Sequence, residues 1–165
     1  MIKNFLFLLF ATFICTSLNA QNSVDEILEK YNSGKVPYIT AEELRMHQLN
    51  EEVIILDTRN KEEFEVSHLS KAILVGYDEF DLGKVKKIDK DQKIVVYCSI
   101  GVRSENIGVK LIKAGYKNVE NLYGGIFDWK NKDFPVVDAL GKSTEKVHAY
   151  SKHWSKWLRN AEKIY

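Results

Sequence analysis

The chain alternates between short apolar runs and segments whose apolar residues recur with helical spacing. The helical or turn segments include one that opens with Thr40 and Glu43, spaced as a capping box for a helix over residues 41–49. Strands that alternate with helices favour an α/β fold, here a mainly parallel five-stranded sheet with helices on both faces. The runs predicted to form its strands are residues 36–39, 53–57, 72–75, 94–97 and 119–122.

The carboxyl end, residues 137–165, carries a pattern that predicts an amphipathic helix within residues 143–163. Ser143 is its candidate N-cap, and basic residues occupy much of the opposite face. Such a helix can lie on an anionic membrane surface or pack on the domain. We favour packing, away from Cys98, because large aromatic side chains usually lie in a core. The apolar residues of the predicted helix are spaced three or four positions apart, and the last two are adjacent. They are Val147, Tyr150, Trp154, Trp157 and Leu158.

The first twenty residues have the pattern of a secretory signal peptide. Lys3 begins a short positive region, residues 5–14 are almost all apolar, and Leu18-Asn19-Ala20 before Gln21 has the form of a cleavage site. A membrane anchor is the alternative, but the apolar run is shorter than the roughly 17 to 25 residues that span a bilayer. We therefore expect an exported protein, periplasmic or extracellular, with no membrane association after cleavage.

Composition and charge fit one globular domain. With 165 residues, 45% of them hydrophobic and 28% charged, the chain can bury a core of ordinary size. The formal net charge is +1, and loss of a leader whose one charged residue is Lys3 makes the mature chain nominally neutral. This balance disfavours nucleic acid as a partner. The oligomeric state stays open. We expect residues 21–35 to form a helix and linker before a domain over residues 36–136.

The strongest candidate for chemistry is a loop between a strand-like run and a helical segment. It reads Cys98-Ser99-Ile100-Gly101-Val102-Arg103-Ser104. Backbone N–H groups at such a strand-to-helix turn converge, and the helix dipole adds positive charge. Both effects would lower the pKa of Cys98 from the free value of about 8.5 and hold an anion beside it. A buried core cysteine is the alternative, but the nearby Gly101 and Arg103 favour a nucleophile.

The loop spacing separates two chemistries. Cysteine phosphatases of the tyrosine-phosphatase kind place five residues between Cys and Arg, whereas four lie between Cys98 and Arg103. The loop resembles the active-site loop of the rhodanese sulfurtransferase family. Over residues 36–136 the motif order is also similar, with departures at Ser67 and Leu74. The further matching motifs are Asp57-Thr58-Arg59, Ser67-His68-Leu69, Gly124-Gly125 and Trp129.

The resemblance implies a sulfurtransferase. Cys98 would take a sulfane sulfur from a small anionic donor, thiosulfate-like or a persulfide, hold it as a persulfide and pass it to a thiol or cyanide. Arg103 would hold donor charge or brace the loop, and Asp57 and Arg59 would form a structural ion pair below it. No cofactor is implied. The backbone amides expected to bind the anionic sulfur belong to Ser99, Ile100, Gly101, Val102, Arg103 and Ser104.

Two alternatives to sulfur transfer stay open. One is a sulfur-relay or protein-binding module with little turnover, and the other, disfavoured by the short loop, is a cysteine phosphatase or arsenate reductase. His68 is left out of the mechanism, since a corner histidine usually bonds to backbone. No metal site is expected, because the four histidines show no ligand spacing with Cys98. Cys15 would leave with the leader, so no internal disulfide is expected.

Overall fold

A computed structural model describes residues 24–165, and the predicted signal peptide therefore lies outside the described residues. The described chain contains a five-stranded sheet in the order β1-β5-β4-β2-β3, with every neighbouring pair parallel. The predicted α/β fold and parallel sheet are confirmed. The strands are β1 (Tyr38–Ile39), β2 (Ile54–Asp57), β3 (Ile73–Leu74), β4 (Lys93–Tyr97) and β5 (Asn118–Leu122).

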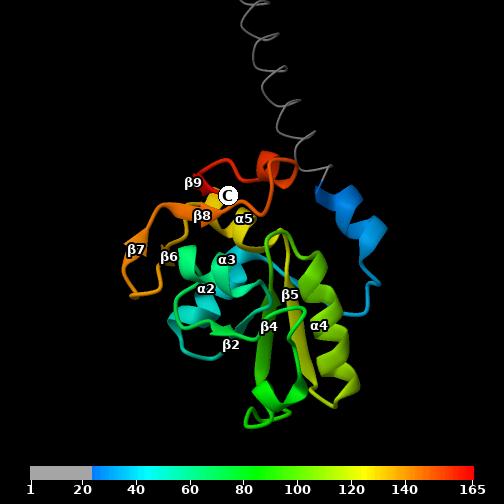
Figure 1. The fold of residues 1–165 in the computed structure, drawn as a ribbon. Helices are drawn as coiled ribbons and strands as arrows, with labels where there is room; N and C mark the ends of the chain where they lie inside the picture. Colours follow the sequence, from blue (N-terminus) through cyan, green and yellow to red (C-terminus); the bar gives the residue numbers. More distant parts are fainter. Residues whose placement is uncertain (1–23) are drawn as a thin grey trace, which may run out of the picture.

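Helices cover both faces of this sheet, as Figure 1 shows. The central strand β4 is apolar on both faces because alternate side chains point to opposite sides. Val95 and Tyr97 join the core cluster that includes residues of α2 and α5, whereas Ile94 and Val96 join the cluster that includes α4. The helices are α2 (Ala41–Leu49), α3 (Lys61–Val66), α4 (Val102–Lys113) and α5 (Gly125–Asn131); residues 24–31 are also helical, and η1 (Leu82–Val85) is a 3₁₀ turn.

The start of α2 has the capping box that the sequence predicts. The Glu43 backbone N–H donates to Thr40 Oγ1 at 3.2 Å, and the Thr40 N–H donates to the Glu43 carboxylate at 3.0 Å. These bonds satisfy two backbone donors that a helix start leaves without partners. They fix where α2 begins directly after β1.

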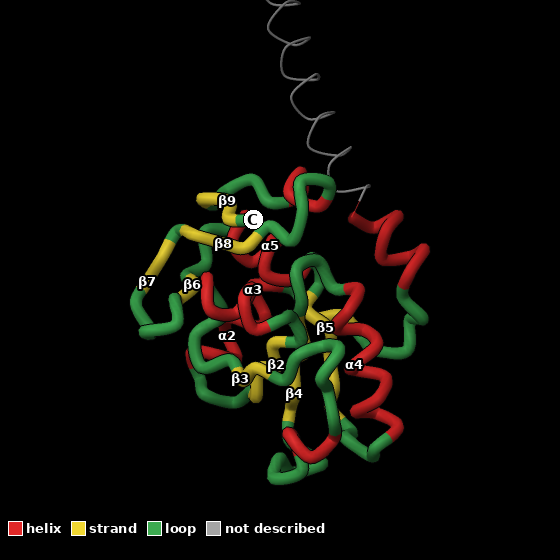
Figure 2. The backbone as a smooth tube through the Cα atoms, viewed as in Figure 1, coloured by secondary structure: helices red, strands yellow, loops and turns green. Residues whose placement is uncertain are grey.

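The predicted carboxyl-terminal helix is wrong. Val147 and Ala149 are both buried at a spacing of two, which is the periodicity of a strand, and Tyr150 has a left-handed backbone with φ 63°. Backbone pairing between two short strands replaces helical hydrogen bonds, and the segment is largely loop in Figure 2. Its elements are β6 (Val136–Val137), β7 (Ser143–Thr144), β8 (Lys146–His148), η2 (Trp154–Trp157, a 3₁₀ turn) and β9 (Glu162–Ile164).

This terminal segment packs on the domain, as predicted. Val147 and Leu158 are fully buried, and they belong to the same core cluster as Ile126 and Trp129 of α5. In Figure 1 the segment, drawn in orange and red, runs along the end of the molecule where α3 and α5 lie. Within residues 24–165, no helix has the length and apolar character needed to span a membrane.

Removing one buried side chain of this segment should destabilise the whole domain. We expect Leu158→Ala to lower the free energy of unfolding by about 2 to 5 kcal/mol, because it leaves a cavity in a core that relaxes only partly. Leu140→Ala is the matched control: Leu140 is 79% exposed, and its truncation should change stability by less than about 0.5 kcal/mol. Urea denaturation measures both, and equal effects would contradict the packing described here.

Candidate active site

The loop from Cys98 to Gly101 connects the carboxyl end of β4 to the start of α4. Gly101 caps α4 with φ 104°, a conformation that L side chains rarely adopt. A Cβ there would also lie 3.3 Å from the backbone oxygen of Leu122. Glycine at this position lets the chain turn sharply, so that the backbone of the loop folds back towards Cys98.

Cys98 is the first residue of this turn, directly after β4, and is only 1% exposed. The Gly101 N–H donates to its sulfur at 3.2 Å. Burial raises the pKa of the Cys98 thiol, but the charge of Arg103 and hydrogen bonds from Ser104 and Gly101 outweigh burial, so the pKa lies below its ordinary value. The site therefore favours a thiolate, which is the nucleophilic form of cysteine.

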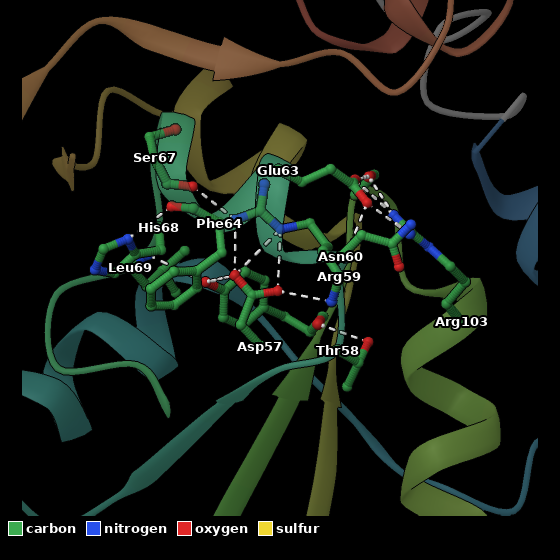
Figure 3. A network of polar contacts seen from close by, with 12 residues as sticks. Asp57, Thr58, Arg59, Asn60, Glu63, Phe64, Ser67, His68, Leu69 and Arg103 are labelled. Carbon is green, nitrogen blue, oxygen red and sulfur yellow. Dashed lines mark hydrogen bonds and ion pairs between the residues drawn. The ribbon is translucent and has the colours of Figure 1, made fainter. Parts of the chain in front are cut away.

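Arg103 is held by Glu63 in a two-pronged ion pair. Both guanidinium-to-carboxylate distances are 2.7 Å (Figure 3). Arg103 Nη2 also donates to Ser99 Oγ at 3.0 Å. Glu63 is buried, and although burial raises its pKa, its bonds to Arg103 and the nearby guanidinium of Arg59 bring the pKa below the ordinary value. Arg103 thus braces the loop and pairs its charge with a carboxylate of α3.

Glu63 is a site residue that the sequence analysis did not identify. Its spacing from Asn60 is that of a capping box, and its carboxylate does accept the Asn60 backbone N–H at 3.1 Å. This local function accounts for the sequence pattern. The approach of Glu63 to Arg103, forty positions away, depends on the sheet topology and leaves no signal in the local sequence.

Asp57 and Arg59 form a fully buried ion pair of 2.7 Å at the carboxyl end of β2, beneath the loop. Arg59 Nη2 also donates a hydrogen bond to the Ser67 backbone oxygen at 2.7 Å, and the Tyr97 hydroxyl donates to Asp57. Figure 3 shows this network beside the Glu63–Arg103 pair. Its hydrogen bonds join the ends of β2 and β4 to the corner that follows α3. Neither Asp57 nor Arg59 lines the pocket that contains Cys98.

The start of α5 approaches the loop from the other side. The Ile126 N–H donates to the Cys98 carbonyl at 2.9 Å, and the Phe127 N–H donates to that of Ser99 at 3.1 Å. A Cβ on Gly125 would lie 2.3 Å from the Cys98 carbonyl oxygen, which is too close for two atoms that are not bonded. The Gly124-Gly125 pair is therefore needed for close approach as well as for the turn.

Ser104 and Asn121 fix the first turn of α4. The Ser104 hydroxyl donates to Asn121 Oδ1 at 2.7 Å, and the Asn121 amide donates to the Gly101 carbonyl at 2.8 Å. Both side chains are fully buried. Asn121 lies in β5, between Val119 and Leu122, where the strand pattern gave no reason to assign it to the site.

A pocket of about 260 Å³ opens above Cys98. Ile100 and Val102 of the loop line it together with Ser99 and Arg103. The remaining lining residues come from the two ends of the described chain: Tyr31, Tyr150 and Trp154. The expectation that the carboxyl-terminal segment packs away from Cys98 is therefore wrong, because its strand-and-turn path carries Tyr150 and Trp154 to the pocket where a straight helix would not.

His68 lies in the corner after α3 and does not line the Cys98 pocket. Its Nδ1 is 3.0 Å from the Phe64 carbonyl oxygen, its ring stacks on that of Phe64, and its backbone pairs with Val137. Among residues 24–165, no cluster of three His, Cys, Asp or Glu side chains is arranged to hold a metal ion.

Comparison with known proteins gives the family. The sequence pattern of the rhodanese-like domain matches residues 40–132. The chain belongs to this family. A rhodanese-related protein from Thermoplasma volcanium has a similar structure, with a TM-score of 0.54 and 28% identity, covering 61% of this chain and 97% of that one. The thiosulfate sulfurtransferase of Pseudomonas aeruginosa, at 22% identity and a TM-score of 0.59, shares the fold over 84% of this chain and 26% of that one.

Curated relatives of this rhodanese-like chain are longer proteins. The tRNA uridine(34) hydroxylase of Hamiltonella defensa is 35% identical over 114 residues, 61% of this chain and 32% of that protein. The enzyme of the same name from Leptospira interrogans is 34% identical over 113 residues, 66% of this chain and 30% of that protein. The chain thus spans about a third of the length of these relatives.

The lowered pKa of Cys98 should appear in the pH dependence of alkylation. The reaction rate with iodoacetamide rises as pH passes the thiol pKa, and we expect its midpoint below about 8.5, the value of a free cysteine. Arg103→Ala should raise the midpoint, because the guanidinium charge favours the thiolate. Arg45→Ala, which removes a cation of α2 that does not line the pocket, is the control. A wild-type midpoint at or above the free value would contradict this electrostatic account.

Proposed function

We propose that this chain is a sulfurtransferase that carries a sulfane sulfur on Cys98. The observation that supports this most is the geometry of Cys98, with its sulfur beside the Gly101 N–H and Arg103 close enough to favour the thiolate. In this proposal, backbone N–H groups of the loop stabilise the anionic outer sulfur of the persulfide. The loop that contains Cys98, Gly101 and Arg103 lies within residues 40–132, which match the rhodanese-like domain, and it resembles the active-site loop of that family.

The proposed reaction has two balanced steps. The Cys98 thiolate attacks the outer sulfur of the donor; a new S–S bond forms, the donor's own bond to that sulfur breaks, and thiosulfate leaves as sulfite or a persulfide as its parent thiolate. A thiolate or cyanide then attacks the outer sulfur of the Cys98 persulfide. The S–S bond to Cys98 breaks, and the thiolate is restored. Neither step needs a cofactor.

The names of the longer relatives suggest a second candidate function, hydroxylation of a tRNA uridine. This chain spans about a third of those proteins, and its net charge of +1 offers little attraction to the phosphates of tRNA. We therefore propose sulfur transfer rather than tRNA hydroxylation.

Sulfur loading tests the proposal directly. Purified protein treated with thiosulfate, polysulfide or glutathione persulfide should gain roughly 32 Da, one sulfur atom, in intact mass, and cyanide should remove it. Cys98→Ser should gain nothing. No gain with any of the three donors would contradict the proposal and favour a binding module. Turnover of an aryl phosphate would instead favour the phosphatase alternative.

Export is a separate part of the proposal, supported by the leader-like pattern of residues 1–20. We expect the protein isolated from its native cells to begin near Gln21 and to fractionate outside the cytoplasm. Amino-terminal sequencing of the fractionated protein measures this. Recovery of uncleaved chain in the cytoplasm or the membrane fraction would contradict export.

A further inference from the structure

Three aromatic side chains stand over Cys98, and the family domain does not supply them. Tyr31 comes from the helical residues 24–31, and Tyr150 and Trp154 come from the carboxyl-terminal segment. All three lie outside residues 40–132, the part that matches the family. We call this group the aromatic vestibule. Tyr31 and Tyr150 are about half exposed, at 55% and 49%, so the vestibule offers apolar surface at the mouth of the pocket.

Hydrogen bonds hold one side of the aromatic vestibule in place, and a contact between two rings holds the other. On the amino-terminal side, the Asn32 amide donates to the Gly101 carbonyl at 3.0 Å and Ser33 Oγ donates to Glu105 at 2.7 Å, directly after the helix that carries Tyr31. On the other side, the ring of Trp154 lies 5.1 Å from that of Trp157. The aromatic surface is therefore built into the fold beside the nucleophile.

The charges at the pocket do not suit a dianion such as thiosulfate. Among the described residues that line it, Arg103 alone carries a positive charge. That charge is matched by Glu63 through two bonds of 2.7 Å, and the guanidinium also lies 4.7 Å from the centre of the Tyr150 ring. Binding thiosulfate through Arg103 would require breaking a largely buried ion pair, which is costly. The loop N–H groups remain to hold the sulfur end of a donor.

A cationic ligand does not fit either, although aromatic groups often bind cations. Arg103 already occupies one face of Tyr150 with positive charge. The Tyr31 ring likewise already has a cation of the chain beside it, since Lys30 Nζ lies 5.2 Å from the ring centre. The apolar loop residues Ile100 and Val102 continue the aromatic surface down to Cys98. The lining thus matches a neutral, apolar group of a size close to an aromatic ring.

We propose that the donor is an organic persulfide whose apolar, ring-bearing group binds in the aromatic vestibule; this inference rests on the proposed sulfur transfer. The outer sulfur of the donor R–S–SH would meet the Cys98 thiolate at the loop, while R packs against Tyr31, Tyr150 and Trp154. The S–S bond of the donor breaks, Cys98 gains the outer sulfur with its proton as a persulfide, and R–S⁻ leaves. Atoms and charge balance without a further reactant.

Matched donors test this inference. The initial rate of sulfur loading on the full protein is measured by intact mass with benzyl persulfide, methyl persulfide and thiosulfate. The first two react by the same chemistry and differ in the ring. We expect benzyl persulfide to load about three- to tenfold faster than methyl persulfide at low concentration, the range that one or two aromatic contacts supply.

Variants locate the effect. Tyr31→Ala and Trp154→Ala should lower the benzyl-to-methyl rate ratio towards one, and Trp154→Phe should retain most of it. Tyr165→Ala, which removes a 61% exposed ring outside the pocket, should leave the ratio unchanged. Tyr31 is half exposed, so its truncation keeps the test valid if Trp154→Ala unfolds the protein.

The outcomes separate the two proposals. A ratio near one in the wild type overturns the assignment of the aromatic vestibule. So does a ratio that both Tyr31→Ala and Trp154→Ala leave unchanged, or that Tyr31→Ala leaves unchanged where Trp154→Ala does not fold. Loading by methyl persulfide or thiosulfate would in that case still support sulfur transfer. No loading by any of the three donors overturns the proposed function, and this inference with it.

Discussion

The ion pair between Glu63 and Arg103 is the contact on which the site depends. It joins α3 to the first turn of α4, and through Ser99 and the Tyr150 ring it also reaches the cysteine loop and the carboxyl-terminal segment. Two charges removed from water stabilise a fold only when their geometry and remaining hydrogen bonds are good. Here the pair is two-pronged, and Asn60 and Ser99 satisfy further carboxylate lone pairs. The same pair sets the charge beside Cys98.

Local patterns were enough to predict the sheet and the cysteine loop. The apolar runs within β2 and β4 predict strands buried on both faces, because such strands are apolar along most of their length. The position of Cys98 at the end of β4 followed from that assignment. Contacts between distant segments left no such pattern. Glu63 and Asn121 reach the site because parallel strands bring their carboxyl ends together, which spacing along the chain does not encode.

The carboxyl-terminal segment shows how one pattern fits two structures. Val147, Trp157 and Leu158 have helical spacing, yet they are buried by a strand and a 3₁₀ turn that happen to place them in the same core. The deciding factors are the pairing of β8 with β9 and the left-handed backbone at Tyr150. Neither is readable from hydrophobic periodicity, because strand pairing is a tertiary interaction and tyrosine has no local preference for positive φ.

The same segment contributes different side chains to the core and to the pocket. Val147 and Leu158 are completely buried in the core, whereas Tyr150 and Trp154 face the pocket and are partly exposed. Exposed positions tolerate substitution at little cost to folding, whereas core positions do not. Variation at the exposed Tyr150 can therefore change the lining of the pocket mouth while the cysteine loop and the folding core stay intact. The pocket above Cys98 can thus change through segments that lie outside residues 40–132, the part that matches the family.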